Sequence, residues 1–361
     1  MQVQELHIKT TSLKEEAIDL LSKLIETPSF SKEENKTADI IADFFLQKGI
    51  PTQRHLNNVW VKSKYFEETK PTLLLNSHHD TVKPNTGYTL NPFDAILQDG
   101  KLFGLGSNDA GGALTSLIAT FLHFYSKENL NYNIVFTASA EEEISGTNGI
   151  EALLPHLGKI EFGIVGEPTL MNLAVAEKGL LVLDCTNYGK AGHAARKEGD
   201  NALYHAIKDI QWFKEHQFKK VSELLGPVKM SITSIETENK AHNVVPSVCK
   251  FVADIRVNEL YTFEEIINEI KQNVNCTIEP RSLRMRSSSI SLDHPLIKSG
   301  LELGRNTYGS PTTSDKALMP FPTLKMGPGD SARSHTADEF IYVDEINEGI
   351  ELYIKLIEKI I

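Results

Sequence analysis

Two histidines and an aspartate close an apolar stretch of the chain, in the segment LLLNSHHDTVKP. Side chains alternate along a β-strand, so His78 and Asp80 share one face of the expected strand and His79 points to the other. A histidine that binds a metal commonly donates its second N–H to a carboxylate, and Asp80 is placed to accept it. Taken alone, the pair is also typical of a polar strand end without a function, so its meaning depends on which other ligands converge there.

Acidic residues follow apolar segments, or precede a helix, at three more places. Asp109 lies in GLGSNDAGGALT, a glycine-flanked turn that fails the phosphate-loop pattern G-x-G-x-x-G because Asp109 occupies the last glycine position. Glu141, Glu142 and Glu143 follow IVFTASA, and three such carboxylates repel one another unless cations or protons neutralise them. Glu167 ends the apolar segment FGIV. Singly, an aspartate before a helix is often only a cap, and a charge run is often a solvated face.

Together, these segments indicate one site, because ligands in open α/β sheets gather outside the carboxyl ends of the strands. His335, on the loop SARSHTADEF, is the last candidate. The three cysteines are too few and too scattered for a thiolate zinc site or a disulfide framework. A set of histidines and carboxylates suits zinc, cobalt or manganese, and bridging carboxylates most suggest a hydrolase with two metal ions.

The elements that must position these residues follow from the apolar pattern. Capping boxes at Ser12–Glu15 and at Ser31–Glu34 predict the starts of two helices. Four short apolar runs are expected to form strands, namely 59–64, 73–77, 134–138 and 162–165. An apolar helix at 112–125 lies between the second and third strands, which predicts a βαβ unit and a largely parallel sheet covered on both faces.

Beyond residue 180 the pattern changes to longer alternating strands with two helices, expected at 202–212 and 263–273, the second opened by Thr262 and Glu265. We therefore predict an α/β catalytic domain with a mixed, mostly parallel sheet flanked by helices, and an α+β domain inserted into it. The expected boundaries are 1–178 and 289–361 for the catalytic domain and 179–288 for the insertion.

The overall composition limits the class of protein. The 361 residues are 40% hydrophobic and 24% charged, which is typical of a globular chain. A net charge of −11 argues against nucleic acid as a partner. No apolar run approaches the roughly 18 residues of a membrane span, and the N-terminus lacks the apolar region of a signal peptide. We expect a soluble, cytoplasmic protein without a membrane partner.

The ordered set of motifs resembles the M20 family of metallopeptidases and amidohydrolases. The match consists of HxD, an aspartate in a glycine-flanked turn, EE, GEP and a C-terminal histidine, with AGHAA and HNVVPS in the insertion. The resemblance implies a zinc-exopeptidase-like catalytic domain with a dimerisation or lid domain. Two departures, Ala110-Gly111 where the family often has Lys-Gly and Ser77 in place of a glycine, replace no ligand and leave the subfamily open.

The resemblance also implies a role for each residue in the motifs. One metal ion would be held by His78, Asp109 and Glu167. A second would be held by Asp109, Glu143 and His335, with Asp109 bridging and zinc as the expected metal.

The other roles implied by the resemblance concern catalysis and substrate binding. The base would be Glu142, just before the ligand Glu143, although the triple glutamate also allows a register shifted by one residue. Asp80 would orient the first histidine, and His193 would stabilise the oxyanion across a dimer interface. Asn243 and Arg256 match positions that bind substrate, although Arg256 is equally compatible with an ordinary exposed strand position.

These roles predict a metal-dependent hydrolase that removes an acetyl or succinyl group from an amino acid. The loop MGPGDSARSHTADEF resembles that of acetylornithine and acetyl-lysine deacetylases, which favours N-acetylornithine or N-acylcitrulline and a role in arginine or lysine biosynthesis. The alternatives are a dipeptidase or tripeptidase, succinyl-diaminopimelate desuccinylase, and a non-catalytic metal-binding or scaffold relative. A homodimer formed through the insertion is expected.

Overall fold

The computed structural model describes the backbone of residues 2–361 and the side chains of residues 12–361. The chain divides into two compact units. Unit 1 comprises Met1–Val175, Ile290–Tyr308 and Ser314–Ile361, and unit 2 comprises Ala176–Ser289 and Gly309–Thr313. The short segment 309–313 belongs to unit 2, whereas the sequence boundary at residue 289 assigned it to the catalytic domain.

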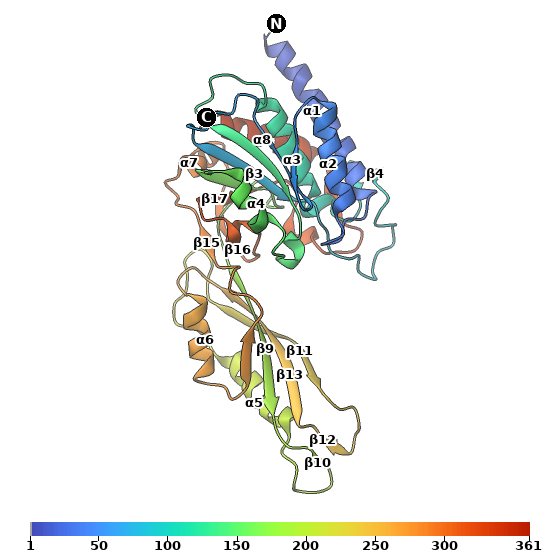
Figure 1. Ribbon diagram of the computed structural model, residues 1–361, viewed down its shortest axis with the longest axis vertical. Coiled ribbons are helices and arrows are strands. Elements are labelled where there is room, and N and C mark those ends of the chain that lie inside the picture. The colour runs from blue at the N-terminus through green and yellow to red at the C-terminus, as the bar shows by residue number, and fades with distance from the viewer. Residues whose placement is uncertain (1) are drawn as a thin grey trace. The chain divides into compact units, whose positions relative to one another are not determined.

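Unit 1 is built on a sheet with helices on both faces (Figure 1). Its helices are α1 (Gln2–Ile25), α2 (Asn35–Gln47), α3 (Gly112–Phe124), α4 (Ile150–Leu157), α7 (Pro295–Glu302) and α8 (Val343–Glu358). Its sheet strands are β1 (Gln53–His55), β2 (Asn58–Lys62), β3 (Thr72–His78), β6 (Asn133–Ser139), β7 (Phe162–Val165), β17 (Thr323–Lys325) and the first part of β8 (Leu173–Glu177). A smaller sheet contains β4 (Ile96–Gln98), β5 (Lys101–Phe103) and β18 (Phe340–Tyr342), and short helical turns are η1 (Ser107–Gly111), η2 (Glu142–Ile144), η3 (Asp315–Leu318) and η4 (Ser331–Arg333).

The strand order β1-β2-β6-β3-β7-β17-β8 has a parallel centre and antiparallel edges. β3 pairs in parallel with β6 and β7, and β17 pairs in parallel with β7. β2 and β8 add antiparallel partners at the two sides. This arrangement confirms the predicted α/β class with a mixed, mostly parallel sheet.

Alternating side chains of the central strands bury both faces of the sheet, which explains their continuous apolar sequences. Leu73 and Leu75 of β3 enter the core beneath α1, α3 and α8, whereas Leu74 enters a second core beneath α4. β6 divides in the same way, with Phe136 on the first face and Val135 on the second. The carboxyl ends of these strands are therefore held on both sides by packed helices.

Unit 2 is an antiparallel sheet with two helices on one face. Its sheet order is β11-β13-β9-β14, from strands β9 (Gly179–Tyr188), β11 (Lys229–Thr237), β13 (Val248–Val257) and β14 (Thr277–Pro280). Its other elements are α5 (Ala202–Glu215), α6 (Phe263–Lys271), β15 (Ser288–Ser289) and a two-stranded ribbon of β10 (Gly192–His193) and β12 (Val244–Val245); β16 (Thr307–Ser310) crosses the unit boundary. Alternate residues of β9 and β13, such as Leu183 and Ala253, pack into one core with Phe263 of α6.

Of the three predicted capping boxes, two are absent and one is present. α1 continues through Ser12 without a break. α2 begins at Asn35 with Glu34 at the cap position and no side-chain cap, and the Ser31 hydroxyl donates a hydrogen bond to Asp80. The capping box of Thr262 and Glu265 at the start of α6 is formed as expected. Among residues 2–361, no helix combines the length and apolar character that crossing a bilayer requires.

Candidate metal centre

His78 is the last residue of β3 and its side chain is only 1% exposed. The ring Nδ1 lies 3.0 Å from the main-chain oxygen of Asp80 and 3.5 Å from its carboxylate Oδ1. A donor hydrogen on Nδ1 leaves the Nε2 lone pair free, and this buried Nε2 has no hydrogen-bond partner among the described residues. An orphaned imidazole nitrogen facing carboxylates is what a metal ligand requires.

Asp80 connects the ends of β3 and β6. Its Oδ1 accepts the N–H of Glu142 at 3.0 Å, and its Oδ2 accepts the N–H of Glu143 at 3.2 Å and the hydroxyl of Ser31 at 2.7 Å. Burial disfavours the charge of Asp80, but contacts with His78 and Ser31 outweigh burial and hold its pKa below the usual value. The carboxylate therefore fixes both the histidine ring and the backbone of the two glutamates.

Asp109 lies in η1, the turn that leads into α3. Its Oδ1 is 3.4 Å from Nε2 of His78, and its Oδ2 is 3.6 Å from Nε2 of His335. The turn requires glycine at position 111, because a Cβ there would lie 2.4 Å from the carbonyl oxygen of Gly106. With one oxygen directed to each histidine, the carboxylate has the arrangement of a bridging ligand.

The three glutamates after β6 separate into different environments. Glu141 has a left-handed backbone, and its side chain accepts a hydrogen bond from Asn148. Glu143 Oε2 lies 3.1 Å from Nε2 of His335, whereas Glu142 Oε2 lies 3.9 Å from Nε2 of His78. This geometry matches the register in which Glu143 is a candidate ligand with His335 and Glu142 lies beside the candidate ligands.

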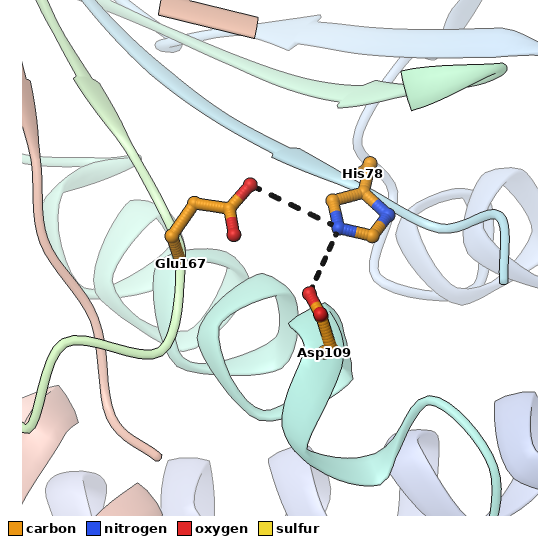
Figure 2. Close-up of side chains that lie close together, drawn as sticks. All are labelled: His78, Asp109 and Glu167. Atoms are coloured by element: carbon orange, nitrogen blue, oxygen red, sulfur yellow. Dashed lines mark ion pairs between the residues drawn. The ribbon is translucent and has the colours of Figure 1, made fainter. Parts of the chain in front are cut away.

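Glu167 follows β7 and completes the first group (Figure 2). Its Oε1 lies 3.9 Å from Nε2 of His78. The preceding position favours glycine, because a Cβ on Gly166 would lie 2.8 Å from Cδ1 of the buried Leu117 in α3 and 3.2 Å from the Cβ atoms of Ala113 and Ser77. Close packing of this strand end against α3 thus brings Glu167 to His78.

The ligand atoms form two groups that share one residue. His78, Asp109 and Glu167 offer atoms within 4.8 Å of one another, and so do Asp109, Glu143 and His335. The first group is largely buried, whereas the side chain of His335 is 55% exposed. The five residues named from the sequence therefore converge from four strand-end or turn segments and one distant loop.

The electrostatics of the centre call for cations. Burial raises the pKa of Glu167 to about 8 and raises that of Glu142 well above its usual value. Burial alone would lower the pKa of His78, but Asp109 and Asp80 raise it well above the usual value. The protein alone thus balances the clustered carboxylates with protons, and divalent cations on the nitrogen and oxygen ligands would replace those protons.

Two buried acids near the centre were not recognised from the sequence. Glu339 accepts the backbone N–H groups of Gly106, Asn108 and Asp109 at 2.9–3.0 Å. Asp315 accepts hydrogen bonds from buried polar side chains, Asn76 and Ser139. The sequence offered one signal for Glu339, which is a glutamate directly before an apolar strand in ADEFIYV. The sequence around Asp315 offers no such signal.

The remaining predicted site residues lie in unit 2. His193 is exposed on β10, and the carbonyl of Asn243 accepts the N–H of Ala194 beside it. Arg256 lies near the other end of β13, eight residues beyond Val248 and so about 26 Å along the strand. Its Nε and Nη2 donate to Asp254. Unit 2 therefore groups His193 with Asn243 and separates both from Arg256.

Comparison with known proteins gives a consistent sequence match. Residues 74–359 match the sequence model of Peptidase family M20/M25/M40, which spans well over half of the chain. A curated relative named succinyl-diaminopimelate desuccinylase, from Orientia tsutsugamushi (strain Ikeda), is 26% identical over 274 residues, covering 71% of each chain.

Solved structures show the same fold. A tripeptidase from Staphylococcus aureus superposes with a TM-score of 0.77 at 20% identity, covering 96% of this chain and 98% of that one. A Bacillus subtilis protein described as a dinuclear metal-binding peptidase of the M20 family gives a TM-score of 0.71 at 15% identity, covering 96% and 98%.

Proposed function

Because the chain belongs to Peptidase family M20/M25/M40 and is a hydrolase of amide bonds that depends on metal, we propose that it removes the succinyl group from an N-succinyl amino acid. The observation that carries the proposal is the pair of ligand groups that share Asp109 with Glu142 beside them. We propose a succinyl rather than an acetyl group on the substrate because the curated relative is named a desuccinylase. An acetylated substrate and a role in arginine biosynthesis stay predictions from the sequence.

The ligand set fits two divalent cations. His78, Asp109 and Glu167 would hold one, and Asp109, Glu143 and His335 the other, with zinc suited to this mixture of nitrogen and oxygen donors. When bound, two cations polarise the amide carbonyl and lower the pKa of a water molecule.

Glu142 is the proposed general base. It lies beside His78, with its side chain 12% exposed, and belongs to neither ligand group; its raised pKa suits a residue that takes a proton and returns it. In this role its carboxylate accepts a proton from water and delivers it to the leaving amine nitrogen. The N–H bond from Glu142 to Asp80 fixes the backbone from which the base acts.

A group of cations in unit 2 supports a substrate with two carboxylates. Lys229 on β11 lies directly opposite Arg256 on β13, and the pKa of Lys178 is lowered by burial and, to a smaller extent, by these two cations. Like charges opposite each other cost stability, and Asp254 is the one acid bonded to Arg256. The family resemblance gives Arg256 a role in substrate binding, and an N-succinyl amino acid offers two carboxylates to such cations, whereas an N-acetyl amino acid offers one.

We further propose that two copies of the chain associate through unit 2. β11 is an edge strand of nine residues, and the neighbouring helix α5 exposes Tyr204 and Ile207 one turn apart. Edge strands of this kind can pair in an isologous dimer. In that dimer the exposed His193 would donate to the oxyanion in the partner's site. Light scattering should give the mass of a dimer for the wild type and a smaller mass for Tyr204→Lys.

The experiment removes metal with a chelator, restores zinc or cobalt, and measures release of the amine from N-succinyl-diaminopimelate, N-succinylornithine, N-acetylornithine and a tripeptide. Glu142→Gln should abolish release. Glu141→Gln is the matched control, since Glu141 bonds to Asn148 outside both ligand groups, and it should stay active. Preference for an acetylated substrate or the tripeptide would overturn the succinyl assignment. No turnover despite two bound metal ions would favour a non-catalytic relative.

A further inference from the structure

A cavity of about 370 Å³ lies in unit 1, and none of the five metal-ligating residues lines it. One wall is a face of α8 that carries Glu345, Glu348 and Leu352. The lining also contains the turn Leu170–Met171 and Arg305, which follows α7. The volume falls in the range of small-molecule sites.

Most charges in this cavity are already paired. Glu345 accepts a hydrogen bond from Arg333 at 2.6 Å. Glu351 is bonded to Lys14 at 2.6 Å and lies 3.7 Å from Lys355. These pairs neutralise one another, so the charges available to a ligand in the cavity come from the other ionic side chains that line it.

Arg305 and Glu348 are the two lining charges without a partner in the described part of the chain. Neither side chain forms a hydrogen bond or an ion pair there, and Nε of Arg305 is buried with no acceptor. A buried guanidinium N–H without an acceptor is costly, which favours occupancy by a group that accepts a hydrogen bond. A lone anion would satisfy Arg305 but would face the glutamates, and a lone cation would face Arg305.

The rest of the lining is apolar. Leu170 is 48% exposed, and Met171, Leu352 and Pro328 add further apolar surface. One free cation, one free anion and an apolar wall match a molecule with a carboxylate, an ammonium group and an apolar side chain. We propose that this cavity binds a free apolar α-amino acid, with its carboxylate on Arg305, its ammonium on Glu348 and its side chain on Leu170 and Leu352.

The backbone around the cavity also joins the segments that carry the metal ligands. Leu170 lies three residues beyond Glu167, and its N–H donates to the carbonyl of Gly329 at 2.7 Å. The residue after Gly329, Asp330, donates its N–H to the side chain of Asn108, which precedes Asp109. The amino-acid site thus lies behind the loops of the metal centre and shares none of its ligands.

Isothermal titration of the metal-loaded protein with L-leucine tests the proposal. Two analogues that each lack one charge, 4-methylpentanoate and 3-methylbutylamine, are the ligand controls. Leucine should bind, and both analogues should bind at least tenfold more weakly, because each forfeits one charge-assisted contact. Arg305→Gln and Glu348→Gln should each weaken leucine binding at least tenfold.

The variants also separate this site from binding at the metal centre. Arg305→Gln removes no bond described in the structure, so its melting temperature should not fall below that of the wild type and its hydrolytic activity should equal that of the wild type. Leucine binding that is unchanged in both variants would place the ligand elsewhere and overturn the proposal. Equal binding of 4-methylpentanoate and leucine would overturn the assignment of the ammonium group to Glu348, and absence of heat with leucine would refute the site.

Discussion

Replacing Glu339 by glutamine should weaken metal binding through the loop that holds Asp109. One oxygen of Glu339 accepts the N–H groups of Asn108 and Asp109, both at 2.9 Å, and the other accepts the N–H of Gly106 at 3.0 Å. Glutamine keeps one acceptor oxygen and replaces the other by a donor. At least one buried N–H in the turn therefore loses its acceptor.

The size of the effect follows from the number of bonds. A buried donor left without an acceptor costs about 1–3 kcal/mol, so the free energy of unfolding of Glu339→Gln should fall by about 2 kcal/mol. Residues that orient a metal ligand typically change metal affinity about 10–100-fold, and a loss in this range is expected because Glu339 bonds to the backbone of Asp109.

Urea unfolding and competition with a metal chelator measure the two quantities. Asp338→Asn is the matched control, because Asp338 also accepts three hydrogen bonds, but from Thr89 and Leu90. The control should bind metal like the wild type even if its stability falls. A Glu339→Gln protein of reduced stability with wild-type metal affinity would refute the positioning role and leave Glu339 a structural acid.

Three further predictions concern stability and substrate preference. In metal-free protein the pKa of Glu167, about 8, lies above its ordinary 4.5, so the folded chain holds a proton that the unfolded chain releases, and stability falls as pH rises towards 8. The pKa of His335 is about 9 in the folded chain against an ordinary 6.5, so its contribution to folding stability is lost between pH 6.5 and 9. The melting temperature should therefore drop from pH 6.5 to 9, and zinc should reverse the drop. A rise in melting temperature over this range would contradict the argument. Gly166→Ala should cost about 1–3 kcal/mol in urea unfolding, since its Cβ meets Leu117, and an unchanged midpoint would disprove the packing argument. Lys229→Gln should raise the KM for N-succinyl substrates more than for N-acetyl substrates, and an equal change would remove Lys229 from acyl selection.

The sequence predicts well which strand-end residues converge, because their placement follows from local rules. An apolar run such as 73–77 identifies a central strand, and the residue at its carboxyl end must lie at the edge where parallel strands finish. His78, Glu143 and Glu167 obey this rule, and the structure places them in the two groups that share Asp109. His335 obeys no such rule, and only the family resemblance assigned it to one ligand set with Asp109 and Glu143.

Contacts between distant loops could not be predicted in this way. Glu339 bonds to residues 230 or more positions earlier in the chain, and no periodicity encodes that pairing. Ser31 has the spacing of a capping residue, yet α2 begins only at Asn35 and the Ser31 hydroxyl donates to the buried carboxylate of Asp80. A local sequence pattern allows several contacts for a side chain, and the tertiary structure determines which of them forms.

The unequal exposure of the two histidines has a kinetic consequence for the metal ions. An ion beside His78 is surrounded by packed strand ends, whereas one beside His335 faces a side chain that is 55% exposed on a loop. Ligand exchange with water should therefore be faster at the second position than at the first. A chelator should empty the protein in a fixed order, and a hybrid with a different metal at each position could be prepared by refilling only the accessible one.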